Sequence, residues 1–292
     1  MLELLNEPIW LLSLGGIFGL LVGSFLNVVI YRLPVMMHTA WRDECAAFLS
    51  EEDDAVDEPK ADRERFDLIK PDSHCPKCKS PIKAWQNVPV LSYVIQGRKC
   101  ASCSTPISAR YPIVEAATAL LTVFVLWQFG NTLQAAFAVL LCWGLITLTM
   151  IDVDHQLLPD SITLPLLWLG LIANSFGLFV DLHSAIWGAI AGYMSLWSVF
   201  WIFKLLTKKD GMGYGDFKLL AALGAWLGWK MLPLIIVLSS LVGAVLGSLM
   251  LLRKNQSQGT PIPFGPYLAV AGGIALFWGD SIVQAYLNYS GF

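Results

Sequence analysis

After Arg110 the chain is almost continuously apolar to its end, and this run constrains the fold more than any other feature of the sequence. Crossing the roughly 30 Å hydrocarbon core of a bilayer takes about 20 helical residues. The whole chain is 56% hydrophobic and only 14% charged, which is too apolar for an ordinary soluble protein. Short polar breaks divide the run into seven predicted membrane helices. The breaks lie near Gly130, 152–160, Asp181, 208–216, Lys230 and 253–266.

An eighth predicted helix lies near the N-terminus. Residues 9–31 form an apolar stretch without a charge, and the acidic Glu3 and Glu7 precede it where a cleavable signal peptide would carry basic residues. We therefore predict a retained span and an all-α polytopic membrane protein with about eight transmembrane helices. The predicted division is a first transmembrane helix at 1–31, a hydrophilic loop at 32–110 and a seven-helix membrane domain at 111–292.

The basic residues predict the orientation. With the N-terminus outside, 18 of the 19 Lys and Arg residues lie on the cytoplasmic side and only Lys230 lies outside. Long loops count for less in this rule, but the short connections alone favour the same orientation by six to one. We expect periplasmic termini and a cytoplasmic loop at 32–110. The formal net charge of −3 gives no basic surface for phosphate contacts, so we expect no nucleic-acid partner.

Four cysteines of this loop form two Cys-x-x-Cys pairs. Cys75 and Cys78 precede Cys100 and Cys103, with 21 residues between the pairs. Two disulfides are the alternative, but in a reducing cytoplasm four thiolates around one zinc ion are favoured. Four protein ligands leave no open position for water, so we predict a structural zinc-knuckle site.

The other two cysteines and the acidic part of the loop receive no chemistry. Cys45 is expected to be a loop thiol, and Cys142 a small buried apolar side chain. The segment 44–72 is acidic and poor in aromatic residues, which is typical of a mobile surface or a short helical insert.

Two aspartates are expected at the cytoplasmic border of the membrane. Asp152 lies at the inner end of the third predicted helix, and Asp216 opens the sixth after the glycine-rich segment 211–215. Two carboxyl groups brought close together share a proton, which leaves one acid and one base to activate a water molecule. Glycines beside Asp216 would let a backbone approach closely. The pattern indicates aspartic-protease chemistry.

Other interpretations of the acidic residues stay open at this point. A single aspartate at a membrane edge more often caps a helix or is solvated, so Asp160 is expected to be a helix cap or boundary residue, and Asp154 and Asp210 solvated charges. A transporter could use such acids as a proton or cation relay, but it would distribute them across the membrane depth. A zinc-knuckle scaffold for secretion machinery would leave the glycine-rich turn before Asp216 unexplained.

Several short motifs, taken together and in order, are similar to those of one family. Besides both Cys-x-x-Cys pairs, they are residues 23–30, 32–34, 87–93, 110–115, 151–154, 158–160, 213–220 and 263–267. Over nearly its whole length the chain resembles the type IV prepilin peptidases, bifunctional leader peptidases and N-methyltransferases of the GxGD aspartic type.

This resemblance implies that Asp152 and Asp216 are the catalytic pair, and the choice of Asp152 over Asp154 rests on the family pattern. It implies cleavage after a glycine, on the cytoplasmic side of the inner membrane and in contact with its lipid. The implied substrates are type IV prepilins and type II secretion pseudopilins. Their leaders are short and basic.

The resemblance also implies methylation of the new N-terminal residue, often Phe, with S-adenosylmethionine as donor. No glycine-rich nucleotide fingerprint follows a predicted strand, so the donor site has no motif of its own. Gly97 and Glu115 are the candidate cofactor-binding residues. Gly97 could instead make a turn before the second knuckle, and Glu115 could instead pair with Arg110 or tune the aspartate pair.

Overall fold

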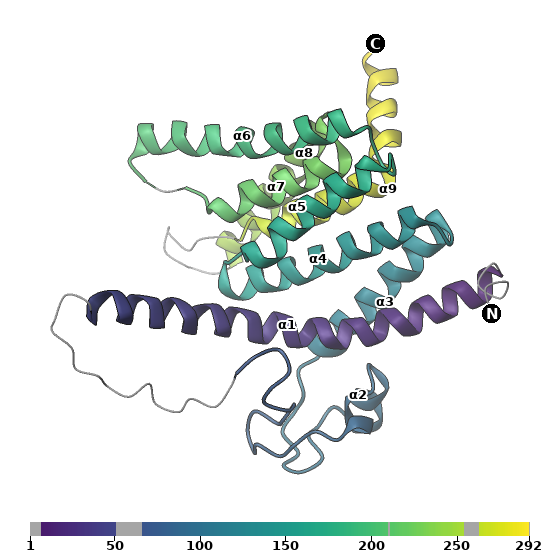
Figure 1. Cartoon of the computed structure of the whole chain (residues 1–292), viewed down its shortest axis with the longest axis vertical. Helices are drawn as coiled ribbons and strands as arrows, with labels where there is room; N and C mark the ends of the chain where they lie inside the picture. The colour runs from purple at the N-terminus through teal and green to yellow at the C-terminus, as the bar shows by residue number, and fades with distance from the viewer. Residues whose placement is uncertain (1–6, 51–65, 210, 254–262, 292) are drawn as a thin grey trace. The chain divides into compact units, whose positions relative to one another are not determined.

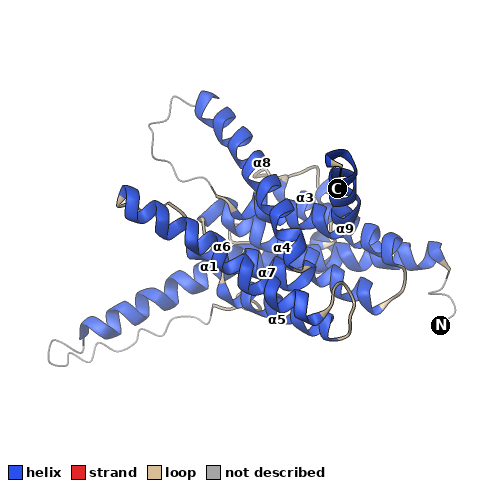
Figure 2. Cartoon of the chain, turned by 90° about the horizontal axis from the view of Figure 1, so that it is seen from above, coloured by secondary structure: helices blue, strands red, loops and turns tan. Residues whose placement is uncertain are grey.

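The computed structural model describes residues 7–50, 66–209, 211–253 and 263–291. Within these ranges the chain consists of helices and connecting loops without a strand (Figure 2). It divides into two compact units, Met1–Trp127 and Gln128–Phe292, which are described in turn. The predicted all-α class is confirmed.

The first unit contains α1 (Pro8–Ser50), α2 (Leu91–Ile95) and nearly all of α3 (Arg110–Phe129), together with a short 3-10 helix at Ala84–Asn87. Helix α1 is 43 residues long and continues well past residue 31, where the apolar run ends. Residues 32–50 contain several charged residues and Pro34, which set the end of the predicted span. They contain no glycine and several good helix formers, and hydropathy detects the membrane-spanning part of a helix rather than its end.

Helices α1 and α3 cross closely because α1 presents glycines at the crossing. A β-carbon on Gly23 would lie 2.7 Å from the Cα of Glu115, and one on Gly19 would lie 2.8 Å from the Cα of Ala119. Glycines four residues apart let two helix backbones approach in this way, as is common in membrane proteins. The crossing places Glu115 directly against α1.

Two polar side chains of α1 hold neighbouring segments of the first unit. Asn27 Nδ2 donates to the carbonyl of Tyr111 at 3.1 Å, at the start of α3. The buried guanidinium of Arg32 donates to the carbonyl oxygens of Asp67 (2.9 Å) and Pro71 (2.5 Å). Backbone carbonyls thereby satisfy a cation that is costly to bury.

Within its described residues the second unit contains six α-helices, labelled in Figure 1, and a short 3-10 helix at Trp229–Met231. Six of the eight long helices of the described chain, all but α5 and α7, are long and apolar enough to cross a membrane. The predicted polar breaks fall between them. The bounds are α4 (Leu133–His155), α5 (Asp160–Ser175), α6 (Leu182–Thr207), α7 (Tyr214–Leu227), α8 (Leu232–Arg253) and α9 (Gly265–Ser290).

Helix α7 is the centre of this unit. It contacts α5, α6 and α9, and every residue from 219 to 227 is buried (Figure 1). An apolar surface on all sides is typical of an interior helix. Helix α6 lies very close to it, since a β-carbon on Gly188 would lie 2.2 Å from the carbonyl oxygen of Gly224.

Asn174 fixes the C-terminal end of α7. Its Nδ2 donates to the carbonyl oxygens of Ala225 (2.8 Å) and Trp226 (3.0 Å), which the end of the helix leaves without an intrahelical partner. Its Oδ1 accepts from the backbone N–H groups of Phe179 and Val180, both at 3.1 Å. One buried amide therefore joins α5, α7 and the connection to α6.

We expect Asn174→Ala to destabilise the protein by roughly 2–4 kcal/mol, because it leaves buried backbone groups unpaired. The loss is measured as a lower midpoint of thermal unfolding in detergent. Ser175→Ala is the control, since its hydroxyl is exposed and bonds only to the carbonyl of Ile172 in its own helix. Equal midpoints for the two variants would contradict this role of Asn174.

Candidate active site

Asp152 lies in the last turns of α4 and is buried, with 5% of its surface exposed. The backbone N–H of Gly265, the first residue of α9, donates to its Oδ2 at 2.9 Å. Asp154, two residues later on the same helix, is exposed. The structure thus separates two aspartates that the sequence alone did not distinguish.

Asp216 lies in the first turn of α7, after the N-cap residue Gly213, and is 7% exposed. It is close enough to Asp152 for the two carboxyl groups to repel each other electrostatically. The interior packing of α7 fixes its position, because the helix that begins here is surrounded along its length. Two buried carboxyl groups from α4 and α7 therefore face a common region.

Leu158, in the connection between α4 and α5, lies between the segments that carry these groups. A β-carbon on Gly215 would lie 2.7 Å from the Cβ of Leu158, and one on Gly265 would lie 3.1 Å from its Cδ2. The end of α4 and the starts of α7 and α9 consequently meet at one end of the unit. Glycine at position 215 permits this close approach.

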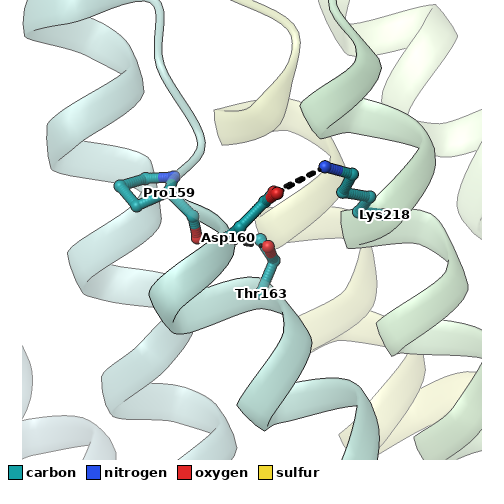
Figure 3. A network of polar contacts seen from close by, with 4 residues as sticks. All are labelled: Pro159, Asp160, Thr163 and Lys218. Carbon is teal, nitrogen blue, oxygen red and sulfur yellow. Dashed lines mark hydrogen bonds and ion pairs between the residues drawn. The ribbon is translucent and has the colours of Figure 1, made fainter. Parts of the chain in front are cut away.

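An ion pair joins the starts of α5 and α7 beside this region (Figure 3). Lys218 Nζ lies 2.7 Å and 2.6 Å from the two carboxylate oxygens of Asp160. Asp160 is the first residue of α5 after the N-cap Pro159, so it is the predicted boundary residue. Its partner 58 residues away was not predicted, because only the tertiary fold brings the two together.

The arrangement of the two aspartates can supply an acid and a base. Burial and mutual repulsion both disfavour a state in which Asp152 and Asp216 are ionised together. One proton shared by the pair leaves one carboxyl group able to donate a proton and one carboxylate able to accept one. This is what hydrolysis of a peptide bond by an activated water molecule needs.

The four loop cysteines form a second cluster, in the first unit. The Sγ atoms of Cys75, Cys78, Cys100 and Cys103 all lie within 4.8 Å of one another. The sulfurs of Cys75 and Cys103 are 3.8 Å apart, and those of Cys78 and Cys100 are 4.0 Å apart. The four cysteines that were predicted as ligands from their spacing are therefore placed to bind one metal ion.

Two copies of the same turn build the cluster. In the first, Cys75 N–H donates to Ser80 O at 2.9 Å, and Lys79 adopts a left-handed φ of 57°. In the second, Cys100 N–H donates to Thr105 O at 2.8 Å, and the equivalent left-handed residue, also with a φ of 57°, is Ser104. The sequence contains the signal for this repeat, Cys-x-x-Cys-x-Ser/Thr-Pro-Ile, which the spacing of the cysteines alone did not reveal.

Hydrogen bonds to the sulfurs favour the thiolate form of Cys75 and Cys103, whereas the pKa of Cys78 is raised, with burial as the largest of the causes that raise it. The backbone N–H groups of Cys78 and Lys77 lower the pKa of Cys75. The side chain and backbone of Thr105 lower the pKa of Cys103 to about 6, with 3.2 Å between Cys103 Sγ and Thr105 Oγ1. Thiolate is the form of cysteine that binds metals.

Glu115 is engaged with the loop. Its Oε2 accepts from the backbone N–H of Val90 at 2.8 Å, and Ser24 of α1 interacts with the same carboxylate. Val90 is the N-cap of α2 and has a φ of 59°, which is unfavourable for a β-branched residue. The carboxylate of Glu115 thus anchors a strained turn to α3.

Gly97 lies where α2 ends and the second knuckle begins. Its φ is 60°, and its N–H donates to the carbonyl of Val94 at 3.0 Å. A β-carbon there would meet nothing within 4 Å, so the glycine is needed for its backbone conformation and not for space. This geometry fits the alternative interpretation of Gly97, in which it makes a turn before the second Cys-x-x-Cys pair.

The remaining predictions, for the other two cysteines and for the acidic residues, have mixed outcomes. Cys142 is buried in α4, as expected, whereas Cys45 is exposed on α1 and so belongs to a helix and not to a loop. Of the acidic segment, residues 44–50 belong to α1. Residues 51–65 and Asp210 lie outside the described residues.

Comparison with known protein families matches two successive segments of the chain. Residues 17–129 match the bacterial peptidase A24 N-terminal domain, and residues 139–248 match the type IV leader peptidase family. The first matched segment lies almost entirely in the first compact unit, and the second lies within the second unit and ends before α9. No solved structure matches the chain.

Several curated relatives match over nearly their full length, and each is named prepilin leader peptidase/N-methyltransferase. The relative from Pseudomonas aeruginosa is 56% identical, covering 99% of this chain and 98% of its own. Those from Stutzerimonas stutzeri (98% and 97%) and Aeromonas hydrophila (99% and 98%) are 55% and 54% identical. With both units matched in order and the two aspartates and four cysteines gathered as described, this chain belongs to the type IV leader peptidase family.

Proposed function

We propose that this chain is a membrane aspartic endopeptidase that removes the leader of type IV prepilins and then methylates the new N-terminus. The observation that carries the peptidase assignment is the pair of buried, interacting carboxyl groups of Asp152 and Asp216. Family membership and the names of the relatives support both activities.

In the proposed reaction the aspartate pair acts on one water molecule. The ionised carboxylate takes a proton from the water molecule while the water oxygen attacks the peptide carbonyl carbon. The protonated carboxyl group gives its proton to the carbonyl oxygen. The C–N bond of the resulting gem-diol then breaks as a proton passes to the leaving nitrogen. The products are a carboxylic acid and a free amine, and the pair again holds one proton.

The location of the pair fits a substrate held by a membrane helix. The ends of α4, α7 and α9 that carry the site follow or precede polar breaks, which we assign to the cytoplasmic border of the inner membrane. A prepilin whose apolar helix begins just beyond the cut would present that bond at this border. We extend the proposal to pseudopilins of type II secretion and to cleavage after glycine.

The cysteine cluster fits a structural zinc ion. Four sulfurs placed tetrahedrally at about 2.3 Å from zinc lie roughly 3.8 Å from one another. Two of the six separations, 3.8 Å and 4.0 Å, match this value, and all six lie within 4.8 Å. A disulfide requires about 2.05 Å between its sulfurs, so this arrangement suits a metal better than two crosslinks.

The methyltransferase activity belongs in this proposal to the first unit. S-adenosylmethionine would supply the methyl group to the new amine, which must be neutral to attack it. Gly97 and Glu115 remain the proposed donor-site residues, but each already has a structural role that accounts for its position. Glu115 orders the turn at Val90, and Gly97 makes the turn into the second knuckle.

The predicted division into 1–31, 32–110 and 111–292 is retained as a functional proposal. Its first part supplies a membrane anchor, its second the metal site, and its third the peptidase. Both catalytic aspartates and the glycines that pack around them fall within the second compact unit, Gln128–Phe292.

We expect Asp152→Asn and Asp216→Asn each to lower the kcat of leader removal by about 100-fold to 10,000-fold, because one carboxyl group cannot fill both roles. Mass analysis of a purified prepilin after incubation measures the cleavage. The matched control is Asp154→Asn on the exposed face of α4, which is expected to cleave like the wild type. Substantial cleavage by Asp152→Asn or by Asp216→Asn would reject the assignment.

We expect elemental analysis of the purified protein to find about one zinc per chain. Replacing Cys75 and Cys100 with Ser should remove the metal and expose the loop to proteases, because metal binding and loop folding are coupled. Cys45→Ser and Cys142→Ser should keep the full metal content. A metal-free wild-type protein would overturn the zinc assignment.

We expect the Asp216→Asn variant to methylate a prepilin that has already been cleaved. The reason is that the proposed methyltransferase residues lie in the first unit and the aspartates in the second. Transfer of a labelled methyl group from S-adenosylmethionine to the N-terminal residue measures this activity. An unlabelled product, with label from the wild type, would contradict the separation of the two activities.

A further inference from the structure

The segment 263–267 resembles a family motif, yet the proposed chemistry gives it no role. It contains Phe264, which precedes α9, and Gly265 and Pro266, which begin the helix. The structure places this helix start against one of the two aspartates and not against solvent, since Gly265 is itself buried.

The backbone at the start of α9 has one N–H group left for an outside acceptor. The N–H groups of Tyr267 and Leu268 already donate to the carbonyl of Phe264, at 3.1 Å and 3.2 Å. Pro266 has no N–H group. The N–H group of Gly265 donates to Oδ2 of Asp152 at 2.9 Å, and a negatively charged acceptor is favoured at this helix N-terminus.

No side chain fits at position 265 without displacing the aspartate. A β-carbon there would lie 2.7 Å from Asp152 Oδ2 and 3.2 Å from its Cγ. It would also lie 3.1 Å from Cδ2 of Leu158, the residue that packs against Gly215 beside Asp216. The β-carbon would therefore displace the carboxyl group itself.

The other glycines of α9 differ from Gly265 in what surrounds them. A β-carbon on Gly272 would lie 2.4 Å from the Cδ2 of Leu223, an apolar contact within the core. One on Gly273 would meet nothing within 4 Å. One on Gly279 would lie 2.9 Å from the Sδ of Met231. Of the four glycines of this helix, only Gly265 therefore lies against a carboxyl group.

We propose that Gly265 is a positioning residue for the peptidase, whose N–H orients the carboxyl group of Asp152 and whose lack of a side chain leaves room for it. The inference rests on the proposed function of Asp152. With Oδ2 held by α9, the carboxyl group cannot rotate freely about its Cβ–Cγ bond, and Oδ1 is the oxygen left for water or the shared proton. Among the described residues, no hydrogen-bond donor is bonded to Oδ1.

The first test is the kinetics of leader cleavage by Gly265→Ala. Displacement of a catalytic group by about 1 Å can lower a rate about 100-fold, so kcat should fall by about that factor while KM stays near the wild-type value. Gly273→Ala should match the wild type in both constants. Gly272→Ala should lower the unfolding midpoint but leave kcat much less affected. A Gly265→Ala enzyme with wild-type kcat, or an equal loss of kcat in Gly272→Ala, would overturn the proposal.

The second test does not require cleavage and uses unfolding midpoints in detergent. Gly265→Ala should lower the midpoint much more in the wild-type background than in an Asp152→Ala background, because the carboxyl group that the new β-carbon meets is then gone and only the looser contact with Leu158 remains. Equal losses in both backgrounds, or failure of the double variant to fold when Asp152→Ala folds, would show that position 265 acts through packing and overturn the proposal.

The two tests also separate this inference from the function on which it rests. If the wild-type protein does not cleave a prepilin, the proposed function fails, but the midpoints still report on the contact between Gly265 and Asp152. If the wild type cleaves, Asp152→Asn does not, and Gly265→Ala cleaves normally, only the positioning role fails.

Discussion

The cost of burying two carboxyl groups close together is the constraint on which the second unit depends. Asp152 and Asp216 are each less than one tenth exposed, and a charge in such surroundings needs compensation or a proton. The fold provides a backbone donor at each of them, Gly265 for Asp152 and Gly213 for Asp216, and the opportunity to share a proton between them. The same condition that makes the pair costly also supplies what the proposed peptidase reaction needs, an acid and a base side by side.

Rigid packing maintains that proximity. Helix α7 is surrounded along its length, with the backbone of Gly188 against it at one level and the amide of Asn174 at its far end. Glycines allow the backbones of α6 and α7 to meet, and the amide of Asn174 pairs the carbonyl oxygens at the end of α7. The helix therefore has little freedom to slide or rotate, and the first-turn residue Asp216 inherits this restriction. The exposed ion pair of Asp160 and Lys218 adds a contact at the same end, but such pairs contribute little by themselves.

Much of this organisation could be predicted from the sequence because it depends on local signals. Polar breaks in an apolar run located the connections between helices, and paired cysteines indicated a metal cluster. Three features needed the tertiary structure. The length of α1 was missed because charged residues and Pro34 follow the predicted span and do not end the helix. The contacts of Gly265 with Asp152 and of Lys218 with Asp160 join residues far apart in the chain, and no periodicity encodes them. The burial of Asp152 beside the exposed Asp154 likewise depends on which helix face meets α9.

The repeated cysteine turns have a consequence for how the loop responds to metal. Each turn contributes two of the four sulfurs, and the separations of 3.8 Å between Cys75 and Cys103 and of 4.0 Å between Cys78 and Cys100 run from one turn to the other. Neither half can complete a coordination sphere, so tight chelation requires both at once. Occupancy is therefore expected to switch the whole segment between a folded and an unfolded form, with no stable half-assembled stage.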